Sequence, residues 1–121
     1  MSNLASRLRD PSLLRTDAFI DGRWLPADSG ETVAVTNPAD GSEVARVARC
    51  GTAETRRAIE AAEQAQIVWR TRTAKSRGDL LRRWFELMMA NQDDLAEILT
   101  AEQGKPLAEA RSEERRVGKE C

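Results

Sequence analysis

The strongest constraint on the fold is a stripe of apolar side chains in the middle of the chain. Across residues 73–90, large apolar side chains recur at intervals of three and four residues, interrupted only by Gly78. This apolar stripe consists of Leu80, Leu81, Trp84, Leu87 and Met88. Because such spacing brings side chains to one side of an α-helix, it predicts an amphipathic helix that begins near Thr73, ends at Ala90 and buries one face.

A second helix is predicted before the apolar stripe, from Ala53 to about Thr71. Gly51 and Thr52 offer an N-cap for it. Apolar side chains then recur at helical spacing, at Ala58, Ala62, Ala65 and Trp69. Because most of these side chains are small, this face is expected to pack closely against another element.

A third helix is predicted from Asn91, as its N-cap, through Glu102. Asp93 and Asp94 fall in its first turn, where negative charge complements the helix dipole. The side chains expected to face inward are Leu95, Ile98 and Leu99. The paired carboxylates are therefore interpreted as helix-start electrostatics. They are not interpreted as a metal or acid–base site, since neither this pair nor Glu113-Glu114 has a convergent third ligand.

Two β-hairpins are predicted ahead of the helices. Asp21-Gly22 lies between the apolar pairs Phe19-Ile20 and Trp24-Leu25, and Asp-Gly in that position favours a two-residue type I′ turn. A second hairpin is predicted from two alternating segments, 33–36 and 43–49, separated by turn-forming residues. The chain is therefore expected to be α+β, with two short hairpins followed by three to four helices.

Residues 1–16 are expected to form a loosely ordered N-terminal arm, because Pro11 restricts Asp10 to extended geometry and interrupts any helix. The chain has 121 residues, 40% of them hydrophobic, which is compatible with one small domain at most. Only 4% of the residues are aromatic, so the core is expected to consist mainly of Ala, Leu and Val.

Composition excludes several classes of function. The chain has no histidine, which removes histidine-based triads and histidine-bearing metal sites. With 19 basic and 20 acidic residues, its net charge of -1 predicts no nucleic-acid partner and no membrane partner. Cys50 and Cys121 lack a C-x-x-C spacing, which indicates neither a zinc site nor a redox pair. A reducing cytoplasm is the expected location.

Cys50 is a candidate nucleophile, because Arg49 and a helix N-terminus lie beside it in the sequence. Its position between a strand and a helix favours a small residue at a turn instead. The basic residues Arg70, Arg72, Lys75, Arg77, Arg82 and Arg83 are interpreted as a solvated helix face. The aromatic residues Trp69, Trp84 and Phe85 are interpreted as packing residues because of their helical spacing.

Gly104-Lys105 could suggest a phosphate-binding loop. Such a loop needs Gly five residues before its second Gly, and Ser or Thr after the Lys, but this chain has Leu99 and Pro106 at those positions. Gly104 is therefore interpreted as a helix stop, and Pro106 as the first residue of a further helix toward Ala110.

Five segments occur in the order and nearly the spacing that aldehyde dehydrogenases show at their N-terminal end. They are 18–25 (AFIDGRWL), 36–41 (TNPADG), 84–89 (WFELMM), 92–96 (QDDLA) and 102–110 (EQGKPLAEA). The chain thus resembles this family across about residues 13–110, most closely its NAD(P)-dependent succinate-semialdehyde type. The resemblance implies that residues 17–110 are the N-terminal part of a cofactor-binding domain, cut from an α/β fold whose parallel sheet is formed by later sequence.

The resemblance also implies a chemistry for the parent protein. It would be a homo-oligomer that oxidises an aldehyde, with succinate semialdehyde expected, to the acid: a thiolate attacks, hydride passes to NAD or NADP, and a Glu-activated water hydrolyses the thioester. The family's segments that carry these groups match no position of this chain. We therefore predict no catalytic, cofactor-binding or metal-binding residue here, and we expect the chain alone to be inactive and to bind neither nucleotide.

An alternative is a stand-alone helical interaction module that presents the apolar stripe to a partner. A reading frame that continues past Ala110 with the family's sequence favours the dehydrogenase. A genuine stop codon after Cys121 favours the module.

Residues 111–121 differ from everything before them, with seven charges in eleven residues. As a peptide they would be a solvated tail. Their codons are compatible with AGATCGGAAGAG and its continuation, which resembles a short-read sequencing adapter translated in frame. We therefore expect this tail to be artefactual and the natural sequence to diverge after Ala110.

Overall fold

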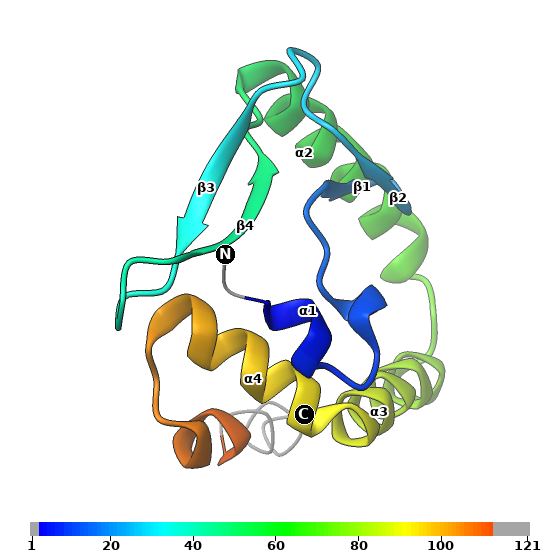
Figure 1. Cartoon of the computed structure of the whole chain (residues 1–121). Coiled ribbons are helices and arrows are strands. Elements are labelled where there is room, and N and C mark those ends of the chain that lie inside the picture. The colour runs from blue at the N-terminus through cyan, green and yellow to red at the C-terminus, as the bar shows by residue number, and fades with distance from the viewer. Residues whose placement is uncertain (1–2, 113–121) are drawn as a thin grey trace.

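The computed structural model describes residues 3–112 and has an α+β architecture (Figure 1). The helix α1 (Leu4–Arg7) and the 3₁₀ turn η1 (Pro11–Leu13) precede the strands β1 (Ala18–Ile20), β2 (Arg23–Leu25), β3 (Thr32–Thr36) and β4 (Glu43–Ala48). The helices α2 (Thr52–Trp69), α3 (Ala74–Ala90) and α4 (Gln92–Gln103) follow, and a further helical segment covers 107–112. The predicted fold class, with two hairpins before the helices, is confirmed. Most of the predicted tail, from residue 113 onward, lies outside the described residues.

The first hairpin pairs β1 with β2 through the predicted turn. Asp21 has a φ of 52° and Gly22 a φ of 73°, and a type I′ turn requires positive φ at both positions. The pairing sets Phe19 opposite Trp24, with ring centroids 5.1 Å apart. The guanidinium of Arg15 lies 5.0 Å from the Trp24 ring centroid, a cation–π distance. The predicted turn is therefore confirmed, and its aromatic pair covers one face of the ribbon.

The second hairpin pairs β3 with β4 in an antiparallel ribbon. Val33 lies opposite Val47, and the register shifts by an irregularity between Val35 and Thr36. The connecting turn is closed by the N–H of Asn37, which donates to the carbonyl of Ser42 at 2.8 Å. This hairpin is also confirmed. One end of the ribbon lies near α2 and the other end near α4 (Figure 1).

The two longest helices begin and end within two residues of their predicted limits. Thr73 caps α3 as predicted, since its Oγ1 accepts the N–H of Ser76 at 3.1 Å. The face of α2 that carries small side chains is less covered than predicted, because Ala62 and Ala65 are exposed. The helix does contact β1. Among the helices of residues 3–112, none has both the length and the apolar content to cross a membrane.

The buried core surrounds α4. Ala96 is 0% exposed and Ala101 is 3% exposed on this helix, and Leu4 (1%) and Leu8 (7%) from the N-terminal arm pack against Ala101. The prediction of a loosely ordered arm is therefore wrong for the described residues of the arm. The sequence spacing of Leu4 and Leu8 is that of one helix face, but α1 is too short for periodicity to reveal it.

The two ends of α4 differ in how well the sequence predicted them. Asn91 stands at the predicted N-cap position, but its side chain makes no capping bond, and its Nδ2 donates to the Leu87 carbonyl at the end of α3 at 2.9 Å. Gly104 ends α4 as predicted, with a φ of 79°. A Cβ at this position would lie 2.8 Å from Cγ of Pro38, so the glycine also permits the close approach of the β3–β4 turn.

Candidate functional site

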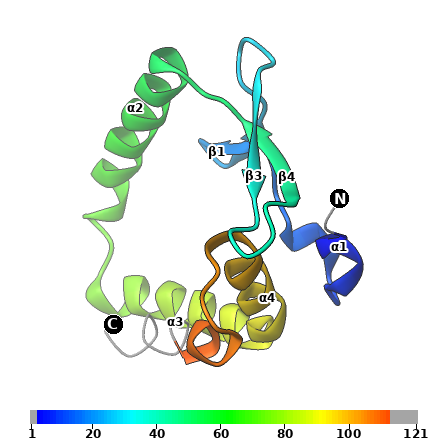
Figure 2. The same ribbon diagram turned by 60° about the vertical axis from the view of Figure 1, so that its left-hand side comes forward.

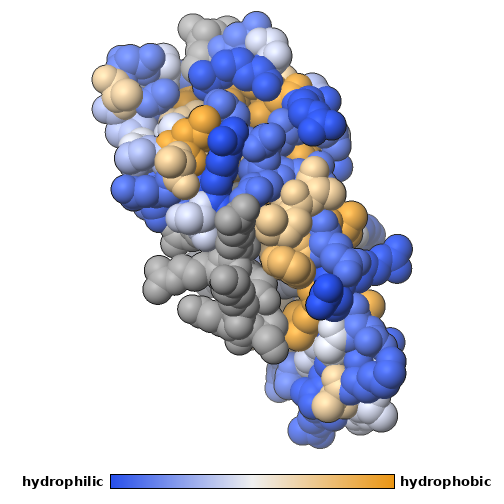
Figure 3. All heavy atoms as spheres, turned by 90° about the horizontal axis from the view of Figure 1, so that it is seen from below, coloured by the Kyte–Doolittle hydropathy of each residue, from blue (hydrophilic) through white to orange (hydrophobic). Residues whose placement is uncertain are grey.

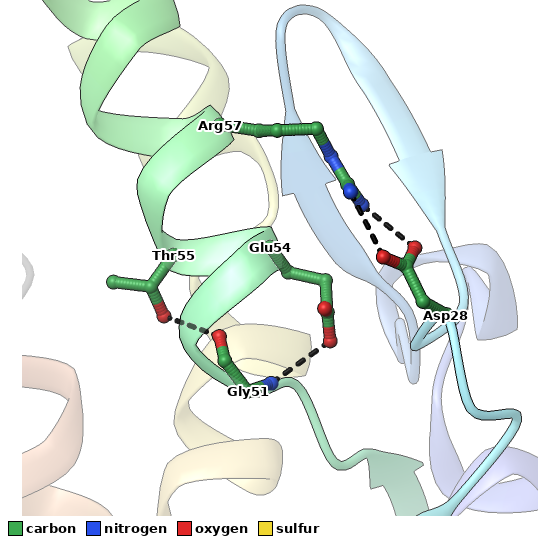
Figure 4. Close-up of polar contacts among 5 residues, drawn as sticks. All are labelled: Asp28, Gly51, Glu54, Thr55 and Arg57. Carbon is green, nitrogen blue, oxygen red and sulfur yellow. Dashed lines mark hydrogen bonds and ion pairs between the residues drawn. The ribbon is translucent and has the colours of Figure 1, made fainter.

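A group of polar contacts surrounds the start of α2 (Figure 4). Glu54 is 6% exposed, and its Oε2 accepts the N–H of Gly51 at 2.8 Å. Thr55 Oγ1 donates to the Gly51 carbonyl at 2.9 Å. A carboxylate here satisfies a free helix donor and complements the positive end of the dipole. The sequence analysis offered Gly51-Thr52 as the cap, and the structure places the cap at Gly51. The analysis missed Glu54, although a Glu three residues after a cap is the usual signal.

Arg57 lies one turn further along α2 and reaches Asp28, in the loop between β2 and β3 (Figure 4). Its two terminal nitrogens donate to the two carboxylate oxygens at 2.8 Å and 2.7 Å. The hydrogen bond from Arg57 holds the pKa of the Asp28 carboxyl below its usual 3.8, and Asp28 in turn raises the pKa of Arg57. Because both groups stay charged at neutral pH, this pair joins a loop to a helix and does not suit proton transfer.

Asp94 makes the second buried carboxylate contact. It is 5% exposed, its Oδ1 accepts the N–H of Arg9 at 2.9 Å, and its Oδ2 accepts the N–H of Asp10 at 2.8 Å. The N–H of Arg9, and next that of Asp10, hold the pKa of the Asp94 carboxyl below its usual 3.8. The interpretation of Asp93 and Asp94 as one helix-start pair is therefore incomplete, since Asp93 instead pairs with Arg111 at 3.1 Å.

The other residues singled out from the sequence are dispersed. Cys50 is an exposed free thiol in the link between β4 and α2. Within the basic set, Lys75 pairs with Asp79 at 2.8 Å and Arg82 with Glu86 at 3.1 Å, both one helical turn apart. These pairs support the interpretation of a solvated helix face, and the contacts do not converge on one point.

A metal site needs clustered ligands, and a dinucleotide site needs a helix start that can accept phosphates. Residues 3–112 contain no group of three His, Cys, Asp or Glu side chains that could hold a metal ion. At the start of α2 the Gly51 N–H is already bonded to Glu54, and the first turn of α4 carries two carboxylates. Since a phosphate needs free N–H groups and no competing negative charge, neither helix start suits it.

An apolar hollow of about 780 Å³ lies between the hairpins and the helices α3 and α4. Figure 2 shows α2, the hairpins and the α3–α4 pair arranged as an open frame. The apolar residues that line it are Leu13, Leu14, Phe19, Trp24, Val35, Val44, Ala45, Val47, Trp84, Leu95 and Ile98. Hydrophobic side chains also lie among hydrophilic ones on the face seen in Figure 3. Phe19 and Trp84 are each 61% exposed, so this hollow presents large apolar side chains to solvent.

Two hairpins followed by three long helices, with an apolar hollow between the hairpins, α3 and α4, resemble part of a larger α/β fold. The sequence profile of the aldehyde dehydrogenase family matches residues 24–121, and the chain belongs to this family. The predicted family is confirmed. The matched range includes residues 111–121, so the artefactual origin of that tail stays a prediction for genomic sequencing.

Individual relatives narrow the comparison. The chain is 61% identical over 106 residues to the 3-sulfolactaldehyde dehydrogenase of Pseudomonas putida, and 53% identical over 107 residues to the NADP(+) succinate-semialdehyde dehydrogenase of Escherichia coli K12. Each match covers 88% of this chain and 22% of the relative. The solved structure of succinate-semialdehyde dehydrogenase from Burkholderia pseudomallei has a TM-score of 0.88 and 55% identity, covering 92% of this chain and 23% of that one. The chain thus spans about a fifth of the length of the curated relatives it matches.

Proposed function

We propose that the full-length protein containing this chain oxidises succinate semialdehyde to succinate with NAD or NADP. The observation that carries this proposal is the likeness to the Burkholderia pseudomallei succinate-semialdehyde dehydrogenase, at a TM-score of 0.88 and 55% identity. In the proposal, residues 17–110 are the N-terminal part of the cofactor-binding domain, and the protein works as a cytoplasmic homo-oligomer.

The names of the relatives support a substrate class wider than one compound. The substrate named for the Pseudomonas putida relative, 3-sulfolactaldehyde, carries a sulfonate, and succinate semialdehyde carries a carboxylate. Both are short aldehydes with a negative charge away from the reacting carbon. We therefore place the substrate in this class, with succinate semialdehyde as its first member.

The test is steady-state oxidation by the full-length protein, followed as reduction of NAD or NADP. Succinate semialdehyde, 3-sulfolactaldehyde and butanal are compared, and butanal is the matched control because it has four carbons and no carboxylate. We expect kcat/KM to be at least about tenfold higher for an anionic substrate, since a hydrogen bond to a charged group contributes about 1.5–3 kcal/mol. Equal values for butanal and succinate semialdehyde would refute the proposed class.

The 121-residue chain alone is proposed to be inactive and to bind neither nucleotide. Supporting this, carboxylates lie at the starts of α2 and α4. Calorimetric titration of the chain with NAD and NADP is the measurement. Saturable heat with either nucleotide would contradict the proposal.

The exposure of the apolar stripe favours a second candidate, the stand-alone interaction module. Trp84 is 61% exposed and Leu87 is 58% exposed, so both could contact a partner. Sequencing the locus separates the candidates, because a frame that continues past Ala110 with the family's sequence supports the dehydrogenase. A stop codon after Cys121 in intact genomic DNA supports the module.

A further inference from the structure

Asp94 joins two parts of the chain that are distant in sequence. Its donors, the N–H groups of Arg9 and Asp10, are 85 and 84 residues away, and each bonds a different carboxylate oxygen. Two adjacent backbone donors facing two oxygens need an ionised carboxylate, because a protonated carboxyl or an amide leaves only one good acceptor. The contact therefore depends on the charge state of a side chain that is 5% exposed.

The N-terminal arm has few other strong contacts at this point. Before it, Leu4 and Leu8 pack on α4. Arg7 approaches Glu97 only to 3.8 Å, with both side chains partly exposed, and a pair of this kind contributes little. After it, Leu13 and Leu14 line the apolar hollow, and Leu14 also packs against the cluster of Leu4, Leu8 and Ala101. Asp94 thus bonds the arm between two segments that pack on this cluster, Leu4–Leu8 and Leu14.

We propose that the Asp94 carboxylate is a latch that fixes the N-terminal arm on α4 and thereby holds one wall of the apolar hollow. Loss of the charge, by acid or by substitution, frees the arm from residue 9 to residue 13, while the packing of Leu14, α4 and the hairpins stay in place. This inference rests on the contacts of this chain and is independent of the proposed function.

The charges around the latch favour the ionised form. From the arm, Arg9 attracts the carboxylate and Asp10 is turned toward Ser12, whose N–H and hydroxyl its Oδ1 accepts. On α4 itself, Asp93 pairs with Arg111 and Glu97 lies near Arg7. The end of α3 beside it, Met89–Asn91, has no ionisable group. Because the folded-state pKa of Asp94 is lowered from 3.8, the latch is fully closed above pH 3.8 and opens as pH falls through the lowered value.

The test is amide hydrogen exchange, resolved by residue, on the 121-residue chain and its variants. Asp94→Asn and Asp94→Ala are expected to speed exchange at Arg9 and Asp10 by about ten- to a hundredfold, in line with the loss of charge-assisted bonds. Asp93→Asn is the matched control, an adjacent and exposed carboxylate on the same helix, and should exchange like the wild type. Amides of β3 and β4 should not change in any variant. Unprotected Arg9 and Asp10 amides in the wild type, or unchanged ones in Asp94→Asn, would overturn the latch.

A pH series supplies a measurement that does not depend on whether an Asp94 variant folds. Amide proton shifts of Arg9 and Asp10 are followed between pH 6 and pH 2 in the wild type and in Asp93→Asn. Both proteins should lose the hydrogen-bonded shifts together, with a midpoint below pH 3.8, before the hairpin signals change. Shifts that do not move in this range, or that move only together with the hairpins, would show that the carboxylate does not hold the arm.

Discussion

The surroundings of α4 and those of α3 differ sharply, although both helices were predicted from the same kind of apolar spacing. Helix α4 contains the buried residues Asp94, Ala96 and Ala101, while α3 contains no buried residue. Yet α3 carries the larger apolar side chains, among them Leu80 at 40% and Trp84 at 61% exposure. An apolar stripe thus predicts that a helix forms, but not that its partner is present.

Side chains of α4 are buried because the elements that pack against this helix lie within the described residues. The arm supplies Leu4 and Leu8, the β3–β4 turn supplies Pro38, and Asp94 fixes the arm by hydrogen bonds. On α3, by contrast, Trp84 lines the hollow, and Leu80, Leu81 and Leu87 are exposed. The α4 region should therefore contribute most of the stability of the described residues, and α3 should contribute least.

Truncation of a large apolar side chain in each region is the strongest test of this contrast. Leu4→Ala removes a side chain that is 1% exposed and should lower the free energy of unfolding by about 2–5 kcal/mol, the range for buried leucine. Leu87→Ala, at 58% exposure, should change it by less than about 1 kcal/mol. Urea unfolding followed by circular dichroism measures both. Similar losses for the two variants would break the comparison.

Glycine-to-alanine substitutions should change the free energy of unfolding in opposite directions at the two helices. Gly104→Ala places a Cβ at a φ of 79° and 2.8 Å from Pro38, so a loss of at least about 1–2 kcal/mol is expected. Gly78→Ala, inside α3 with nothing within 4 Å of the new Cβ, should stabilise by about 1 kcal/mol through helix propensity. Thermal melts of both variants measure the effect, and a destabilised Gly78→Ala would reveal packing on α3 that the structure lacks.

Breaking a surface ion pair should have the smallest effect on the free energy of unfolding, and the effect should be similar on α3 and α4. Asp79→Asn breaks the exposed pair with Lys75 on α3, and Glu97→Gln breaks the pair with Arg7 at α4. Each should change the free energy of unfolding by less than about 0.5 kcal/mol, and less still in high salt. A loss above about 1 kcal/mol from Glu97→Gln alone would mean that charge, and not only apolar packing, distinguishes the α4 region.

Local chemistry explains what the sequence predicted well. Asp21 and Gly22 specify a turn through their own backbone preferences, and Gly104 ends a helix for the same reason. Such features need no knowledge of distant residues. The hairpins, the helix limits and the α+β class could all be predicted on this basis.

Apart from the missed Glu54, whose bond to Gly51 is local, the failures involve contacts between distant residues or competing partners. The bonds of Asp94 span more than 80 residues, and no local pattern distinguishes it from Asp93. Asn91 has the correct residue type for an N-cap, but the carbonyl of Leu87 one turn earlier competes for its side chain. The ordered arm was missed because Leu4 and Leu8 are buried by α4, which follows almost 90 residues later.

The second hairpin has a consequence for association between copies of the chain. In a two-stranded sheet each strand keeps one edge of backbone N–H and carbonyl groups that no other strand of the described residues pairs with. On β4 the charged side chains Glu43 and Arg46 act as gatekeepers against strand addition. The five residues of β3, Thr-Val-Ala-Val-Thr, are uncharged, mostly β-branched and free of proline, which is the composition of amyloid-forming segments. At high concentration, the first contacts that lead to aggregation should therefore form along β3.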